Sequence, residues 1–330
     1  MKKKRKIAFF SLLASTIIIN ATSLFSMVST KFVTSYYSVL EERLFDDYNY
    51  EEYLVEEPYD FESYLNYVPQ GLCFVEDYVL VSSYEYNACD DSIITILDKN
   101  GNLYNRCSLN NDAHVGGLCY DSLHDLIWVS SINGTISAYN RNDIFSKDKC
   151  EPVYEDIDVG KGLTNYRVPF INTVSYITVD DKALYVGNFT INNDGKVKKY
   201  TIEEFSSGNI YLKLDSSFKV PDKVQGIAFY SKDDKKYMII SRSFGTKMPS
   251  VIQLYPYSEN SLDYSESDLY SVIQCPVMIE QIAIRDNILY AVYEANAKPY
   301  VNRNTRDMDS IQAMDADIMI KKLLLEKDTH

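Results

Sequence analysis

The sequence predicts an all-β fold, a β-propeller of five blades with four antiparallel strands each, and six blades as the alternative. Three observations support this prediction. A motif made of a short apolar strand, a turn and a second apolar strand recurs along the chain. Two further strand-like runs with turn residues between them follow most copies. The copies repeat at nearly the period of about 40–50 residues that is typical of propeller blades.

The copies are aligned on one position at the start of each first strand. Three of them carry Gly there and two weaker ones do not; the aligned positions are Gly71, Gly117, Tyr176, Gly226 and Gln281. They lie 46, 59, 50 and 55 residues apart. Such spacing leaves room for four short strands and their turns in each unit. The sixth blade of the alternative would have to be a degenerate unit at 150–170 or before the first copy.

The expected strands follow in chain order, with turn residues such as Asp98–Gly101 and Asn133-Gly134 between them. They span 71–75, 78–83, 92–97, 103–108, 117–120, 126–130, 135–139, 153–159, 176–179, 183–188, 196–201, 210–214, 226–230, 237–241, 251–255, 269–274, 282–284, 288–294 and 318–323. The fifth unit therefore has three strands. Because an open ring would leave unpaired backbone groups at its edges, we expect Tyr53–Val55 to supply the closing strand.

Residues 1–30 are interpreted as a signal peptide or a signal-anchor helix. Lys2–Lys6 is basic, and an apolar run from Ile7 to Ile19 follows. The stretch 7–28 has about the length that spans a bilayer, and no clear cleavage site follows it, so the uncleaved anchor stays open. Either form places the body outside the cell, with membrane contact only through this segment. Residues 31–66 are read as an acidic, Tyr-rich linker that includes the closing strand, and 67–330 as the propeller.

The charge balance limits the class of partner. Residues 31–330 contain 28 Lys and Arg against 47 Asp and Glu, a balance of −19, whereas the whole chain has −14. Such an acidic body disfavours the phosphate backbone of a nucleic acid. The expected partners are a small molecule, a glycan or a cell-surface protein, and the chain is expected to be a monomer.

The candidate site is the mouth of the central channel. In a propeller, the residues before the first strand and after the second strand of each blade meet at one face. The polar residues expected there as ligand-binding groups are Gln70, His114, Asn172, Gln225, Arg242, Glu280, Gln281 and Glu294. Polar residues also line propeller channels that hold only water, so a site without a ligand stays the alternative.

Within this set, chemistry is expected from four residues. The catalytic candidates are His114, Glu280, Glu294 and Arg242, which supply a base, two acids and a cation. A calcium site from Asn172, Asn188 and Glu294 is also considered, since Ca²⁺ prefers carboxylate and amide oxygens. Three histidines in the whole chain do not suffice for a His-rich zinc site. Glycoside hydrolysis is disfavoured because, among the first-strand starts, only Glu280 is acidic.

The chain has six cysteines. Cys73 and Cys119 occupy equivalent positions in two first strands, where they are expected as buried small apolar residues. One disulfide is predicted within the remaining set, and the other thiols are expected to be free. That set is Cys89, Cys107, Cys150 and Cys275.

Several short motifs resemble those of a known group of proteins. They are Pro69-Gln70-Gly71, His114–Gly117, Val224–Gly226, Glu280–Ile282, Tyr293–Ala295 and Lys298–Tyr300. Over roughly 66–325 the chain resembles exported propeller proteins of low-GC Gram-positive bacteria, which are loosely similar to gluconolactonase and strictosidine-synthase-like propellers. The lactonase likeness implies a channel Ca²⁺ held by Glu, Asn and Asp. Asn172, Asn188 and Glu294 match that set, and no Asp does.

Two functions follow as hypotheses. The first is an extracellular binding or scaffold module that uses the channel mouth. The second is a channel-site hydrolase or lactonase, with Ca²⁺ as its metal. The enzyme hypothesis predicts that one mouth holds a set of five side chains, together with either a bound cation or a carboxyl group of strongly shifted pKa. The set is His114, Gln225, Arg242, Glu280 and Glu294.

Overall fold

The structure, a computed structural model, describes residues 50–56, 59, 61–159, 174–246, 248–264, 271–300 and 311–327. The chain divides into two units, residues 1–47 and 48–330, and the first of them, with the predicted signal segment, lies outside the described residues. None of the helices in the described ranges is long and apolar enough to cross a membrane. The described part of the second unit is treated below.

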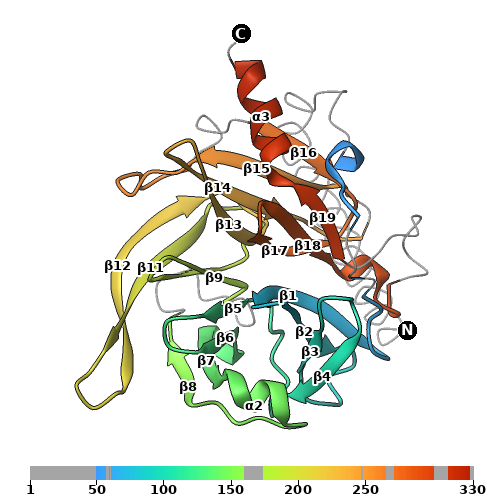
Figure 1. Ribbon diagram of the computed structural model, residues 1–330, viewed down its shortest axis with the longest axis vertical. Coiled ribbons are helices and arrows are strands. Elements are labelled where there is room, and N and C mark those ends of the chain that lie inside the picture. The colour runs from blue at the N-terminus through green and yellow to red at the C-terminus, as the bar shows by residue number, and fades with distance from the viewer. Residues whose placement is uncertain are drawn as a thin grey trace, which may run out of the picture. The chain divides into compact units, whose positions relative to one another are not determined.

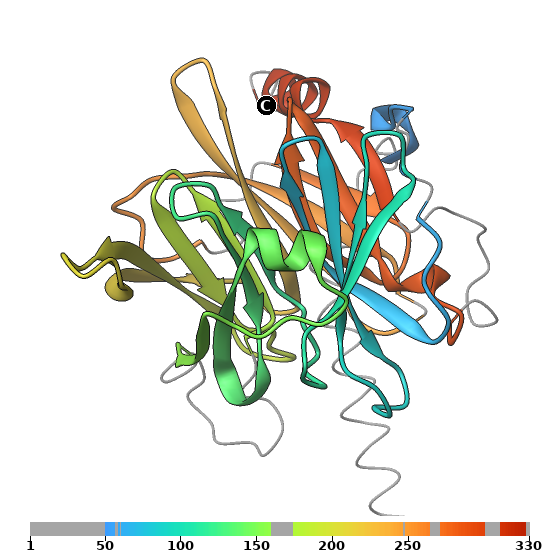
Figure 2. The ribbon, with the colours of Figure 1, turned by 60° about the horizontal axis from the view of Figure 1, so that its bottom comes forward.

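Five antiparallel sheets form a ring, so the five-bladed propeller is confirmed (Figure 1). The first sheet, blade 1, is built from strands β1 (Tyr67–Val75), β2 (Tyr78–Glu85), β3 (Ile93–Leu97) and β4 (Leu103–Ser108). Blade 2 is built from β5 (Leu118–Asp121), β6 (Leu126–Ser130), β7 (Thr135–Asn140) and β8 (Tyr154–Asp158). The short 3₁₀ helix η2 (Ile132–Gly134) precedes β7. Helix α2 (Arg141–Ser146), which was not expected, follows β7 and packs against β4 and β7 (Figure 2).

Blades 3 and 4 repeat the same order of strands from the centre outward. Blade 3 consists of β9 (Tyr176–Asp180), β10 (Ala183–Gly187), β11 (Gly195–Glu204) and β12 (Ile210–Val220). Blade 4 consists of β13 (Val224–Lys232), β14 (Lys235–Arg242), β15 (Ser250–Pro256) and β16 (Ser271–Cys275). The innermost strands β1, β5, β9, β13 and β17 contact one another in turn around the whole ring.

Blade 5 closes the ring with help from the N-terminal side. Its own strands are β17 (Ile279–Arg285), β18 (Ile288–Tyr293) and β19 (Ile311–Asp315). After the 3₁₀ helix η1 (Tyr50–Tyr53), Leu54 forms a bridge with Met314, and the Val55 N–H donates to the Ala313 carbonyl at 3.0 Å. The predicted closure by Tyr53–Val55 is therefore confirmed. Part of the segment read as a linker also packs on the propeller, because Tyr59 and Phe61 are buried between blades 5 and 1.

The predicted third strand of blade 5 at 318–323 is wrong. That segment belongs to helix α3 (Ala316–Lys327), and the strand is β19 just before it. Asp315 accepts a hydrogen bond from the Ile318 N–H at 2.8 Å, which is the arrangement of a helix N-cap. Met319 and Ile320 are buried on one side of the helix. A short apolar run does not distinguish a buried helix turn from a strand, so the sequence pattern misled here.

The core lies between the blades. Five buried clusters each join two neighbouring blades, and the one between blades 1 and 2 contains Leu80, Ile94, Leu118 and Val129. The same junction is bridged covalently by the disulfide Cys107–Cys150, which confirms the prediction of one disulfide. The cysteines left free, among them the buried Cys73 and Cys119, also agree with expectation.

Candidate functional site

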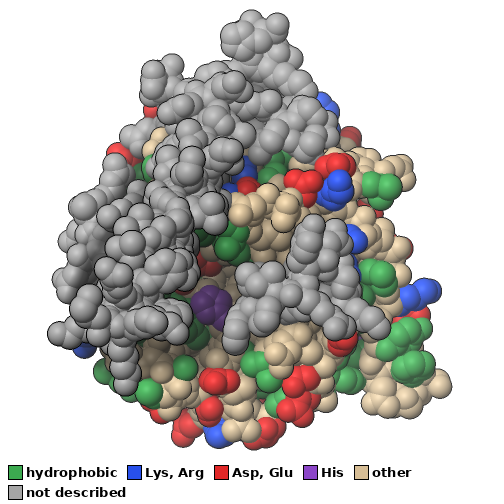
Figure 3. All heavy atoms as spheres, turned by 180° about the vertical axis from the view of Figure 1, so that it is seen from behind, with side chains coloured by type: hydrophobic (Ala, Val, Ile, Leu, Met, Phe, Trp, Pro, Cys, Tyr) green, Lys and Arg blue, Asp and Glu red, His purple; other side chains and the backbone are tan. Residues whose placement is uncertain are grey.

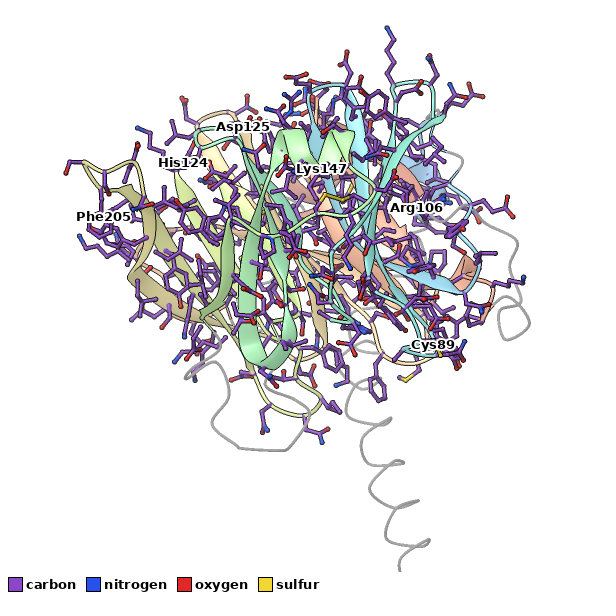
Figure 4. All side chains as sticks on the ribbon, turned by 90° about the horizontal axis from the view of Figure 1, so that it is seen from below. Cys89, Arg106, His124, Asp125, Lys147 and Phe205 are labelled. Atoms are coloured by element: carbon purple, nitrogen blue, oxygen red, sulfur yellow. A yellow bond between two sulfur atoms is a disulfide. The ribbon has the colours of Figure 1, made fainter. Side chains whose placement is uncertain are left out.

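The predicted mouth lies on one of the two open faces of the ring. Figure 4 places Cys89, which follows β2, on one side of the propeller. It places His124 and Asp125, in the turn between β5 and β6, on the opposite side. The first strands begin, and the second strands end, on the Cys89 side. The polar residues predicted from the repeats must therefore be sought on that face.

β-bulges at the start of three inner strands aim side chains into this mouth. The pairing of β1 with β2 shifts between Pro69 and Gly71, and that of β13 with β14 shifts between Val224 and Gly226. The unpaired residues at these shifts are Gln70 and Gln225. In β17 the shift falls between Ile279 and Ile282 and releases two residues, Glu280 and Gln281. A bulge redirects a side chain out of the regular alternation, which is why these four polar residues are tolerated at the start of buried strands.

Glu294 and Glu280 are each bound by an amide from a neighbouring blade. The Gln70 Nε2 atom donates to Glu294 Oε1, and so joins blade 1 to blade 5. The Gln225 Nε2 atom donates to Glu280 Oε1 at 3.1 Å, and so joins blade 4 to blade 5. Glu280 is buried at 6% exposure, whereas Glu294 is half-buried and keeps contact with solvent. The two carboxyl groups thus lie on the closing blade between two clasping amides.

Both carboxyl groups favour their protonated form. Burial raises the pKa of Glu280 well above its usual range, and the nearby charge of Glu294 raises it further. Burial also raises the pKa of Glu294 to about 7, against the hydrogen bond from Gln70, which lowers it. Each effect has an ordinary cause, because an apolar environment and a like charge both disfavour a carboxylate. The pair therefore holds at least one proton near neutral pH.

An aromatic wall stands beside the carboxyl pair. The Tyr84 ring, at the end of β2, lies 4.3 Å from the His114 ring, and its hydroxyl lies 3.4 Å from that of Tyr300. Burial raises the pKa of Tyr84, and the charge of Glu294 adds to the effect, so the phenol is close to that carboxyl. The His114 side chain is exposed, and desolvation by the atoms around it lowers the pKa of its imidazole, which favours the neutral form. Figure 3 shows a histidine side chain in a hollow on the face seen from behind.

Tyr84 was expected at the mouth from its place after the second strand of blade 1, but neither Tyr84 nor Tyr300 was singled out as a ligand-binding or catalytic group. Tyr84 follows the second strand of blade 1, which is the position from which mouth residues were expected, but hydroxyl-bearing aromatics also suit ordinary strands. Tyr300 follows η4 (Glu294–Asn296) and carries no positional signal of the repeat. Its aromatic contact with Tyr86, at 5.6 Å between ring centroids, extends the wall outward.

Gln281 occupies the centre of the ring, below the carboxyl pair. Its Oε1 atom accepts the Leu118 N–H at 2.8 Å. Its Nε2 atom lies 3.2 Å from the carbonyl of Leu72, 2.6 Å from that of Leu118 and 3.1 Å from that of Ile177. With 2% of its surface exposed, the side chain ties blade 5 to the inner strands of blades 1, 2 and 3. The polar atoms of Gln281 are thus used by hydrogen bonds to the inner strands.

Arg242 is held by partners other than the carboxyl pair. Its Nη2 and Nε atoms bind the Asp222 side chain and carbonyl at 2.6 and 2.8 Å, and Nη1 lies 3.1 Å from Gln253 Oε1. Of the five residues that the enzyme hypothesis places together, Glu280 binds Gln225 and lies near Glu294. Tyr84 lies beside His114 and close to Glu294. Arg242 is instead an interior ion pair with Asp222.

The calcium set stays a prediction, because Asn172 lies outside the described residues. Buried Asn188 accepts the Lys196 N–H at 3.4 Å and donates to the Phe189 carbonyl at 3.4 Å, so local backbone groups use its amide. Within the described ranges, His, Cys, Asp and Glu nowhere gather in a group of three or more that fits a metal ion. Glu294 and Asn188 alone would not hold Ca²⁺, which takes about 6–8 oxygen ligands.

Comparison with known proteins gives a fold neighbour. No protein-family model matches the chain, and no curated protein matches it. Among solved structures, it is similar to the Cps50 (Swd1) β-propeller domain of Myceliophteria thermophila, with a TM-score of 0.40 and 10% sequence identity. The match covers 75% of this chain and 83% of that one. This chain is accordingly a β-propeller by its own sheet topology.

Proposed function

We propose that the protein is an exported or membrane-tethered binding module that takes a small molecule at the channel mouth. One observation carries the proposal: polar side chains from four blades or their connections converge on one face. They are Gln70, Tyr84, His114, Gln225, Glu280 and Glu294. The basic and apolar segment 1–30 supports export.

The chemistry of the mouth favours a small organic cation. Glu280 and Glu294 have neutral amides as their hydrogen-bond partners, and neither forms an ion pair with a Lys or Arg of the described ranges. A cation would supply the missing positive charge. The faces of Tyr84 and Tyr300 suit an ammonium group, because the π-systems of aromatic rings attract cations. The net charge of −14 would draw cations toward the protein.

A second candidate, a channel-site hydrolase or lactonase, is favoured by one observation. The carboxyl pair combines a strongly raised pKa with one near 7, which suits general acid–base chemistry at neutral pH. In that function Glu280 would act as the acid and Glu294 or neutral His114 as the base. Arg242, paired with Asp222, would not contribute.

Choline titration tests the binding function. We expect choline to raise the melting temperature of the protein, because a ligand that binds only the native state stabilises it. The neutral isostere 3,3-dimethyl-1-butanol should have no effect. Glu294→Gln should weaken choline binding at least about tenfold, since it removes a charge that faces the ligand. Glu155→Gln, an exposed position on β8, is the matched control and should bind as the wild type does.

Equal affinity for choline and its neutral isostere would contradict the cation-binding function. Turnover of ester or lactone substrates that is lost in Glu280→Gln would favour the hydrolase instead. A parallel Ca²⁺ titration tests the metal prediction. Surface accessibility to added protease, measured on cells that make the full chain, tests export and tethering.

A further inference from the structure

We propose that a cation entering the mouth displaces a proton held by the Glu280–Glu294 pair, so that binding and proton release are coupled. The inference rests on the proposed function, because it needs the cation to bind at this mouth. It goes further by stating what the pair exchanges.

The arrangement of Gln70 and Gln225 around the two carboxyl groups supports the coupling of cation binding to proton release. Glu280 precedes the buried centre of β17 and Glu294 follows β18, so both carboxyls belong to adjacent strands of one blade. Gln70 and Gln225 bind them from either side. An amide N–H donates to a carboxyl group in either protonation state but brings no net charge. The two amides therefore position the carboxyl groups of Glu280 and Glu294, but they do not neutralise the negative charges that the two groups would carry if both were ionised.

Among the described residues, the other groups close to the pair do not change charge near neutral pH. The pKa of Tyr84 is raised by burial and by the nearby charge of Glu294, so the phenol stays protonated. The pKa of the exposed His114 is lowered by partial desolvation, so the imidazole is neutral near neutral pH. Tyr300 contributes a hydroxyl near Tyr84. The guanidinium of Arg242 is held by Asp222. Within the described part of the chain, charge compensation is thus left to a proton or to a cation from outside.

The exchange balances in atoms and charge. Before binding, the pair keeps a proton on one carboxyl group, because two adjacent carboxylates in a buried place disfavour each other. When a quaternary ammonium ion binds, its charge favours the ionised form, and the O–H bond of that carboxyl breaks. The proton passes to buffer, and one positive charge replaces another in the mouth.

Calorimetry with choline tests the exchange, because choline has no group that titrates near neutral pH. Binding is measured at pH 6.5 in phosphate and in ACES, two buffers whose ionisation enthalpies differ and neither of which carries a net positive charge. We expect the apparent binding enthalpies to differ by an amount that corresponds to release of about half to one proton. The affinity should also rise with pH between 5.5 and 7.5, by at most about tenfold per pH unit for one released proton.

The carboxamide variants assign the proton. Glu280→Gln and Glu294→Gln each leave one carboxyl whose pKa burial still raises, so the variant that loses more of the buffer dependence identifies the carboxyl that releases the proton. Wild-type buffer dependence in both variants would show that the released proton does not come from this pair. Glu155→Gln should keep the wild-type buffer dependence. A thermal unfolding transition in each variant checks that the fold is intact. Choline binding with the same enthalpy in both buffers would overturn the exchange and leave the binding function standing. Absence of choline binding would instead refute the cation-binding function and the exchange together.

Discussion

Gln281 shows how one residue can define the centre of a ring. The equivalent position is Gly in three blades, and Gly71 allows a close approach because an added Cβ would lie 2.6 Å from the Leu118 Cβ atom. With no side chains from those blades at the axis, the space is filled by the amide of Gln281. Its hydrogen bonds to Leu72, Leu118 and Ile177 link four of the five blades.

Gln281→Ala should therefore destabilise the propeller. The change leaves the buried Leu118 N–H without its acceptor and creates a cavity at the axis. We expect a loss of about 2–4 kcal/mol in the free energy of unfolding, from an unpaired buried donor and lost packing. Urea denaturation measures it. Gln274→Ala, an exposed residue of β16, should change stability by less than about 0.5 kcal/mol. Similar losses in both variants would contradict the role given to Gln281.

At the scale of elements, hydroxyl groups on the second strands fasten neighbouring blades. Ser82 Oγ accepts the Gly71 N–H at 3.0 Å and donates to the Val115 carbonyl, just before blade 2, at 2.7 Å. Ser241 Oγ donates to the Glu280 carbonyl of blade 5 at 2.7 Å. The recurring Gly in strand one and Ser in strand two are thus one structural device. Blade 5 depends in addition on the pairing of Leu54 and Val55 with β19.

Val55→Pro tests that pairing. Proline removes the N–H that donates to the Ala313 carbonyl, and its ring restricts the chain at the edge of β19. We expect a loss of about 1–3 kcal/mol in the free energy of unfolding. Lys99→Pro is the matched control, since Lys99 is the second residue of the Asp98–Gly101 turn, a position that favours proline. An unchanged unfolding midpoint in Val55→Pro would show that the N-terminal strand does not hold the ring closed.

At the scale of the whole molecule, the disulfide adds a covalent link to one junction of the ring. Cys107 lies on β4, the outer strand of blade 1, and Cys150 lies before β8 of blade 2. The two cysteines are 43 residues apart in the sequence. Both cysteines are buried. The Ser108 N–H also donates to the Asp148 carbonyl at 2.8 Å, so backbone pairing supports the same junction. A cross-link that closes a long loop restricts the unfolded chain most.

Removing this link should lower stability without changing the fold. The double change of Cys107 and Cys150 to Ala should cost about 2–4 kcal/mol in the free energy of unfolding. Wild type in a strong reductant should approach the double variant, because both lack the link. Cys89→Ala, which alters an exposed free thiol, is the control. A double variant as stable as the control would contradict a stabilising role of the disulfide.

Much of the fold could be predicted from local pattern. Gly in the first strand and Ser in the second strand recur in the sequence because the contact between them recurs in the blades. Turns such as Asp98–Gly101 mark the hairpins. The failure at 318–323 arose because periodicity cannot separate a short buried helix from a strand. The mouth was predicted as a set of residues on one face, but the contacts between them were not. Gln70 and Glu294 are in contact although they are 224 residues apart in the sequence. No local sequence pattern predicts such a contact.

The bridge between Leu54 and Met314 joins the N-terminal side of the propeller to its last described strand, which has a consequence for folding during synthesis. Leu54 pairs with Met314 of β19, so this pairing cannot form until the C-terminal part of the chain has been synthesised. Until then the outer edge of β18 is unpaired, and such an edge can recruit a foreign strand. A chain exported from its N-terminus would thus spend its whole passage as an open arc. Closure of the ring requires contact between residues that are far apart in the sequence, and such contacts form slowly in β proteins.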